Sequence, residues 1–155
     1  MAGPYGTILL PTDGSEASLA AATHAGALAV TSDATVYVVS IADSRNRFES
    51  PSSGLAPEAW EEAERERAEA SIEETVARLP DDVAVERRVA TGIPQDEILD
   101  LVDELGADVV VMGTHGRSGL DRYLVGSVTE RVVRHSPVPV LTVRDEREGR
   151  DRDRE

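Results

Sequence analysis

The sequence predicts an α/β fold: a single doubly wound domain with a five-stranded parallel sheet and helices on both faces. Three observations lead to this fold class. Five short apolar segments alternate with four helical segments, which is the order of strand–helix–strand units with right-handed crossovers. The length of 155 residues suits one domain with one sizeable core. Polar loops follow the first and fourth apolar segments, and ligands bind beyond such strand ends.

The first three elements are predicted from changes of pattern. Residues 5–10 (YGTILL) form a short apolar strand that ends at Pro11. Residues 15–30 are rich in alanine and predict a helix. Its positions near helical spacing are Leu19, Thr23, Gly26, Ala27 and Val30. Residues 35–41 (TVYVVSI) form the second apolar strand.

The middle of the chain combines a loop, a charged helix and an edge strand. Residues 43–56 are polar and predict a loop that is either functional or without fixed structure. Pro57 suits the first position of a helix that continues over 58–79, and we expect most of its charge to face solvent. Its apolar stripe is clear only late, at Ile72, Val76 and Leu79. Residues 82–90 alternate in polarity, as an edge strand does.

The last third contains the remaining strands and helices. A helix begins near Pro94, with an apolar face at Ile98, Leu101, Val102 and Leu105. Residues 108–112 (DVVVM) predict a buried strand, 128–135 an amphipathic helix and 138–143 the fifth strand. We assign residues 1–144 to the domain and residues 145–155 to a charged, disordered tail.

A glycine-rich stretch before the last helix carries the strongest functional signal. Its spacing is Gly113-x2-Gly116-x9-Gly126-Ser127. Glycines let the backbone approach a ligand closely, and a helix N-terminus adds unpaired N–H groups and the positive end of its dipole. The pattern predicts a phosphate-binding loop, and the simpler interpretation is that the glycines only make turns.

Neighbouring residues extend this prediction. Ser127 begins an S-x-x-E sequence and is the expected N-cap of the last helix. Val128 and Thr129 are expected to offer N–H groups of the first helical turn. Arg117 and Arg122 are the cations of the loop, and Arg117 either screens phosphate charge or points to solvent.

The same spacing resembles the ATP-binding signature of the universal stress protein family. The similarity extends to Pro11-Thr12-Asp13 and to Val138-Pro139-Val140-Leu141, and it covers residues 5–144. It implies a Rossmann-like sheet of strand order 3-2-1-4-5. It also implies that the chain binds ATP, or else ADP or AMP, with Mg²⁺ at the phosphates, and forms a homodimer through the fifth strands, Val138 to Val143.

The resemblance also implies a set of nucleotide-binding residues. The backbone of Ile41 is expected to pair with the adenine edge, or else Ile41 is a plain core residue. Asp13 contacts the base or sugar, directly or through a metal, or else caps the first helix. His115 contacts phosphate or ribose, or else holds its own turn. The full candidate set is Pro11, Thr12, Asp13, Ile41, Met112, Gly113, His115, Gly116, Arg117, Gly126, Ser127, Val128 and Thr129.

Missing motifs exclude several enzyme classes. The chain contains no G-x-x-x-x-G-K-[ST] and no lysine, and no G-x-G-x-x-G follows the first strand. Ser118 lies in a sequence one residue short of the G-x-S-x-G elbow. There are no cysteines, and His24, His115 and His135 lack metal-site spacing, so we expect no metal bound by these side chains.

The charge balance narrows the possible environment and partners. Asp and Glu total 30 against 16 basic residues, all Arg, for a formal net charge of −14. A lysine-free acidic surface favours a protein from a halophile, and the alternative is a GC-rich genome. It argues against nucleic-acid binding. The sequence shows neither a long apolar run nor a signal peptide, so we expect a cytoplasmic protein with no membrane contact.

These observations favour a nucleotide-dependent regulatory protein of the stress response. A weak ATPase or an adenylyl-transfer enzyme is one alternative, but Asp13 and His115 form no assembled catalytic set, so we expect at most slow ATP hydrolysis. A scaffold that binds protein partners without nucleotide is the other. The glycine pattern argues against a scaffold, which would not need those residues.

Overall fold

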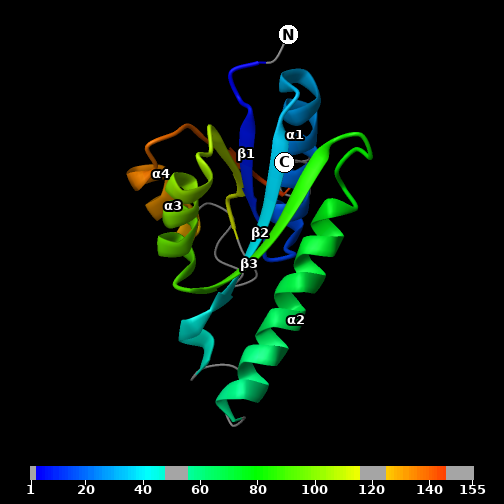
Figure 1. Ribbon diagram of the computed structural model, residues 1–155. Coiled ribbons are helices and arrows are strands. Elements are labelled where there is room, and N and C mark those ends of the chain that lie inside the picture. The colour runs from blue at the N-terminus through cyan, green and yellow to red at the C-terminus, as the bar shows by residue number, and fades with distance from the viewer. Residues whose placement is uncertain (1–2, 48–55, 116–124, 146–155) are drawn as a thin grey trace, which may run out of the picture.

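The computed structural model describes residues 3–47, 56–115 and 125–145. Within these ranges the chain forms five strands, four α-helices and one short 3₁₀ helix, and Figure 1 shows how they are arranged. In chain order they are β1 (Thr7–Pro11), α1 (Glu16–Ser32), β2 (Thr35–Asp43), η1 (Ser44–Arg47), α2 (Pro57–Val76), β3 (Ala84–Gly92), α3 (Pro94–Leu105), β4 (Val109–Gly113), α4 (Ser127–His135) and β5 (Val140–Val143).

The strands form one parallel sheet in the order β3-β2-β1-β4-β5. Ile8 of β1 pairs with Val36 of β2 on one side and with Val109 of β4 on the other. The expected fold class and strand order are therefore confirmed. Because β1 and β4 are central neighbours, the loops that follow them leave the sheet at the same edge.

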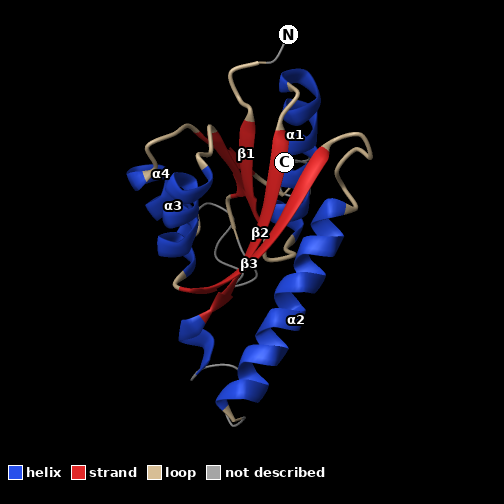
Figure 2. Ribbon diagram, viewed as in Figure 1, coloured by secondary structure: helices blue, strands red, loops and turns tan. Residues whose placement is uncertain are grey.

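Helices cover both faces of the sheet, with α1 and α2 on one face and α3 and α4 on the other (Figures 1 and 2). Side chains alternate accordingly along β1. Ile8 and Leu10 belong to the core under α1 and α2, whereas Leu9 belongs to the core under α3 and α4. A strand buried on both faces needs apolar residues at every position, which explains the continuous apolar runs in the sequence.

Helix α1 packs mainly through alanines, and of the five predicted positions only Leu19 and Gly26 are buried. Its buried residues include Ala21, Ala22, Ala25 and Ala29. Thr23, Ala27 and Val30 are exposed, and the exposed fraction of Val30 is 56%. The prediction of the inner face was wrong at these positions because nearly every residue of this helix is small or apolar, which leaves no clear periodicity in the sequence.

Several predicted boundaries also differ from the structure. Strand β2 continues to Asp43 and is followed by η1, where the sequence predicted a loop, and residues 48–55 of that loop lie outside the described residues. Helix α2 ends at Val76, although Leu79 is buried as expected. Strand β5 begins only at Val140, after Pro139, which has no N–H to donate.

Within the described ranges, no helix is long and apolar enough to cross a membrane. Residues 146–155, most of the predicted tail, lie outside those ranges.

Candidate functional site

A cavity of about 640 Å³ lies at the carboxyl edge of the sheet. This volume falls in the range of small-molecule sites, about 300–1,000 Å³. Eleven of the thirteen predicted site residues line it: Pro11, Thr12, Asp13, Ile41, Met112, Gly113, His115, Gly126, Ser127, Val128 and Thr129. The other two, Gly116 and Arg117, lie outside the described residues, as does Arg122. The fold thus brings the candidates together, and their binding of a nucleotide stays a prediction.

Direct hydrogen bonds join the loops that follow β1 and β4. The Ser15 hydroxyl donates to the carbonyl oxygen of His115 at 3.4 Å, across 100 residues of sequence. The Gly126 N–H donates to the carbonyl oxygen of Thr114 at 2.7 Å, and the Thr129 hydroxyl donates to that of Gly113 at 2.8 Å. These bonds fix the start of α4 against the end of β4.

The start of α4 corrects one prediction. Gly126, not Ser127, occupies the N-cap position, and its carbonyl oxygen accepts the N–H of Glu130 at 2.9 Å. Ser127 is the first helical residue, and within the described part of the chain no side chain caps this helix. With Gly126 bonded to Thr114, the helix begins at Ser127, one residue earlier than the S-x-x-E pattern suggested.

An uncapped start leaves donors at the cavity wall. The N–H groups of Ser127, Val128 and Thr129 have no acceptor within the helix, because the first helical bond is made by Glu130. All three residues line the cavity. Together with the positive end of the helix dipole, these groups make a site suited to an anion.

Asp13 lines the cavity but does not cap α1. The N-cap is Ser15, whose side chain accepts the Ser18 N–H at 3.3 Å. The Asp13 Oδ1 atom accepts the Ser15 N–H at 3.0 Å and the Ser18 hydroxyl at 2.9 Å. The carboxylate is therefore held in a fixed position beside the cavity by the start of α1.

A buried chain of hydroxyls ties α2 to this loop. The Thr75 hydroxyl donates to the carbonyl oxygen of Ser71 at 2.7 Å, so the 2.7 Å bond between the Thr12 and Thr75 hydroxyls must be donated by Thr12. The Thr12 oxygen in turn accepts the Gly14 N–H at 3.1 Å. Each hydroxyl both donates and accepts a hydrogen bond, and together these bonds fix the position of α2 along its axis relative to the end of β1.

Gly113 and His115 serve the structure as well as lining the cavity. A Cβ atom on Gly113 would lie 2.8 Å from Ala17 and 3.0 Å from the Ser18 nitrogen, so the missing side chain lets β4 approach α1. The His115 Nδ1 atom lies 3.1 Å from the Thr114 hydroxyl. Its Nε2 atom is buried without a hydrogen-bond partner among the described residues.

Sequence reasoning missed the part of the cavity that α2 and η1 form. Glu64, Arg67, Ala68 and Ser71 of α2 line it, as do Asp43 and Arg45. The sequence feature that could have identified this wall is a row of residues at helical spacing on α2. All of them are buried in the structure: Trp60, Glu64, Ala68, Ser71 and Thr75. Most members of this row are small or polar, so a search for apolar stripes passed over it.

Charges on this second wall are arranged in pairs. Arg45 lies 2.9 Å from the Asp43 carboxylate, and Arg67 lies 3.3 Å from Glu64. These two arginines are the cations that line the cavity within the described ranges. No cluster of three or more His, Asp or Glu side chains suited to a metal ion occurs there.

Comparisons with known proteins agree with this fold. The model of the universal stress protein family matches residues 4–144. The universal stress protein MJ0531 of Methanocaldococcus jannaschii is 38% identical over 146 residues, which cover 90% of this chain and 82% of that protein. The solved structure of MJ0577 from the same organism is 32% identical with a TM-score of 0.70, covering 92% of this chain and 97% of the other.

A further solved structure includes a ligand. It is a universal stress protein in complex with cAMP, 30% identical to this chain with a TM-score of 0.59. The match covers 91% of this chain and 98% of that one.

Proposed function

This chain belongs to the universal stress protein family, and from that premise we propose that it is an ATP-binding regulatory protein of a stress response. The observation that carries the proposal is the uncapped first turn of α4 opening on the cavity of about 640 Å³. The complex of a relative with cAMP supports an adenine nucleotide as the ligand class.

The cavity divides into two halves that suit the two ends of a nucleotide. Phosphates would lie at the N–H groups of Ser127, Val128 and Thr129, where the helix dipole favours negative charge. The base would lie toward Ile41 on β2, with Asp13 between the two ends. Mg²⁺ would enter with the triphosphate, because the described residues form no metal site of their own and Mg²⁺ readily keeps phosphate and water ligands.

We propose at most slow ATP hydrolysis. General-base catalysis requires a side chain positioned within hydrogen-bond reach of the attacking water. The Asp13 Oδ1 atom is already occupied by Ser15 and Ser18, and no base lies assembled beside a nucleophile among the described residues of the cavity. Binding, rather than turnover, is the activity that this site supports.

The first test is the nucleotide content and affinity of the wild-type protein. We expect mass spectrometry of an extract of the purified protein to detect an adenine nucleotide, and calorimetry at high KCl to give a micromolar Kd for ATP. High KCl is the appropriate condition, because the net charge of −14 favours a salt-adapted protein. No co-purified nucleotide and no heat at millimolar ATP would contradict the proposal and favour a scaffold that binds protein partners.

We also propose a homodimer that pairs through β5, the edge strand of the sheet. An apolar sheet edge invites pairing with another strand, and the exposed fraction of Leu141 in β5 is 42%. We expect the Leu141→Arg variant to shift light scattering at high KCl from dimer mass toward monomer mass. Val30→Arg on α1, where Val30 is exposed, adds the same charge elsewhere and should leave the dimer intact. A wild-type monomer would contradict this proposal.

A further inference from the structure

Glu64 is a buried carboxylate that belongs to the lining of the cavity. Its exposed fraction is 4%, and its Oε1 atom has no hydrogen-bond partner within the described part of the chain. Arg67 approaches that oxygen to 3.3 Å as an ion pair without a hydrogen bond, and 51% of the Arg67 side chain is exposed. A buried charged acceptor is costly unless something donates to it, so this oxygen is suited to a donor from a ligand.

The position of Glu64 follows from how α2 is anchored. Thr75 is fixed to Thr12 at the end of β1, and Glu64 lies eleven residues earlier on the same buried stripe. At 1.5 Å per residue this places Glu64 about 16 Å farther along the helix axis. Helix α2 therefore extends past the end of β1 and packs along β2, which continues to Asp43 (Figure 2).

This location decides which end of a nucleotide Glu64 meets. Helix α2 packs against β2 and β3, whereas α4, whose first N–H groups have no acceptor within the helix, packs against β5 and α3. The two walls thus belong to different sides of the sheet. A carboxylate beside phosphate would be repelled, while the base half of the ligand offers N–H donors. Glu64 accordingly belongs to the base half.

We propose that Glu64 is a specificity-determining residue that accepts a hydrogen bond from the 6-amino group of adenine. This inference rests on the proposed function. An exocyclic amine has two N–H donors, and a backbone carbonyl at the end of β2 can accept only one of them from the base edge. The Oε1 atom of Glu64 accepts the other. A 6-oxopurine presents a carbonyl oxygen at the same place, and an oxygen facing a buried carboxylate leaves both without a donor.

The test compares ATP with inosine triphosphate, which differs at the 6-position and the adjacent ring nitrogen. In Glu64→Gln the side chain keeps its shape, loses its charge and gains an NH₂ that can donate to a 6-oxo group. We expect calorimetry to show that the wild-type preference for ATP over inosine triphosphate falls about tenfold or more, through weaker ATP binding, stronger inosine triphosphate binding, or both. Glu64→Ala, which also removes the carboxylate, should lose the preference as well.

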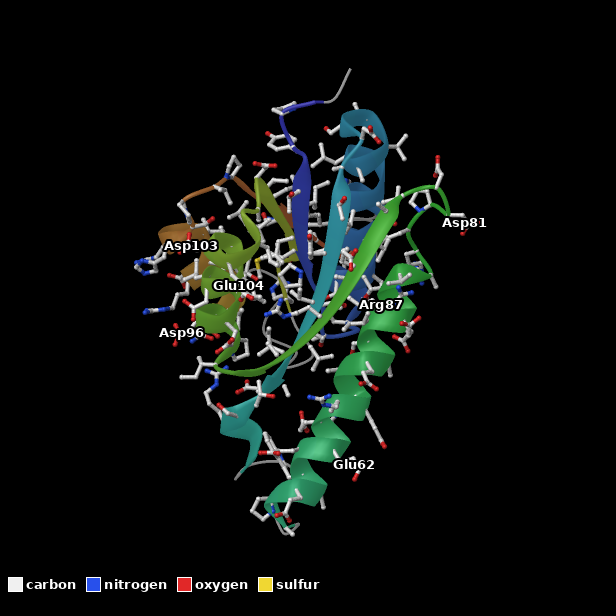
Figure 3. The ribbon with its side chains drawn as sticks, viewed as in Figure 1. Glu62, Asp81, Arg87, Asp96, Asp103 and Glu104 are labelled. Carbon is white, nitrogen blue, oxygen red and sulfur yellow. The ribbon has the colours of Figure 1, made fainter. Side chains whose placement is uncertain are left out.

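The matched control is Glu62→Gln, which makes the same charge change on the same helix. Glu62 is exposed (Figure 3), and two residues of helix turn about 200°, so it faces away from the cavity. We expect this variant to keep the wild-type preference. An unchanged preference in Glu64→Gln and Glu64→Ala, with ATP still bound, would overturn the role of Glu64 and leave the proposed function standing. Absence of ATP binding in the wild type would overturn both.

Discussion

The Gly126→Val variant is expected to lose about a hundredfold or more in affinity for ATP while keeping the fold. Gly126 lines the cavity immediately before the three N–H groups of α4 that have no acceptor within the helix. Its φ of −58° and ψ of 152° are accessible to valine, so the backbone is not strained. The added side chain would fill the space through which a phosphate reaches those N–H groups, and calorimetry with ATP measures the loss.

Two further variants make this result specific. Gly126→Ala adds only a Cβ atom, 3.1 Å from the Thr114 carbonyl oxygen, and should give an intermediate loss. Val125→Ile enlarges an exposed neighbour that does not line the cavity and should bind as the wild type does. Circular dichroism checks the fold of each variant. Wild-type affinity in a folded Gly126→Val protein would remove the assignment of phosphate to this loop.

The Gly113→Ala variant is expected to lose about 1–3 kcal/mol of unfolding free energy by overpacking. The new Cβ atom would lie 2.8 Å from the Ala17 carbonyl carbon and Cβ, so β4 and the first turn of α1 must separate. Both elements are central parts of the structure, so moving either one away from the other costs stability. Urea denaturation measures the loss, and the melting temperature should fall by about 2–4 °C for each kcal/mol in a chain of this length.

Gly6→Ala is the matched control for this prediction. Its Cβ atom would meet only the Asp108 carboxylate, at 3.5 Å, which is an ordinary contact. We expect a change within about 0.5 kcal/mol. If Gly113→Ala lost ATP binding at unchanged stability, the glycine would be required for contact with the ligand and not for the approach of β4 to α1.

The glycine-rich stretch shows what a local sequence pattern can predict and what it cannot. Its spacing predicted a loop between a buried strand and a helix, and the structure places Gly113 and Gly126 at those two ends. The roles of the two glycines were not separable from the sequence. Gly113 is required by Ala17, almost a hundred residues away, whereas Gly126 contacts the nearby Thr114. The glycine spacing shows where side chains are absent, but it does not show which neighbouring atoms require their absence.

Helix α2 shows a case in which the sequence pattern was right for most residues but did not reveal one exception. Its dense charge predicted a solvated face, and most of its acidic residues are exposed, as Figure 3 shows for Glu62. Glu64 is the exception, because Thr75 and Thr12 hold this face of the helix against the end of the sheet. A carboxylate has the same local signature whether it faces solvent or a cavity, so the sequence alone could not identify this residue.

The sequence by itself determined the order of strands and helices and the position of the glycines at the end of β4 and the start of α4, because apolar periodicity and turn residues act over a few positions. The tertiary structure decided the N-cap of α4, the alanine face of α1 and the place of Glu64 in the cavity. Each of these depends on contacts between segments far apart in the chain or across a long loop: Gly126 with Thr114, α1 with the sheet, and Thr75 with Thr12. Local patterns predicted the burial of strongly apolar residues such as Ile98 and Leu101, but whether an alanine or a carboxylate is buried was decided by packing.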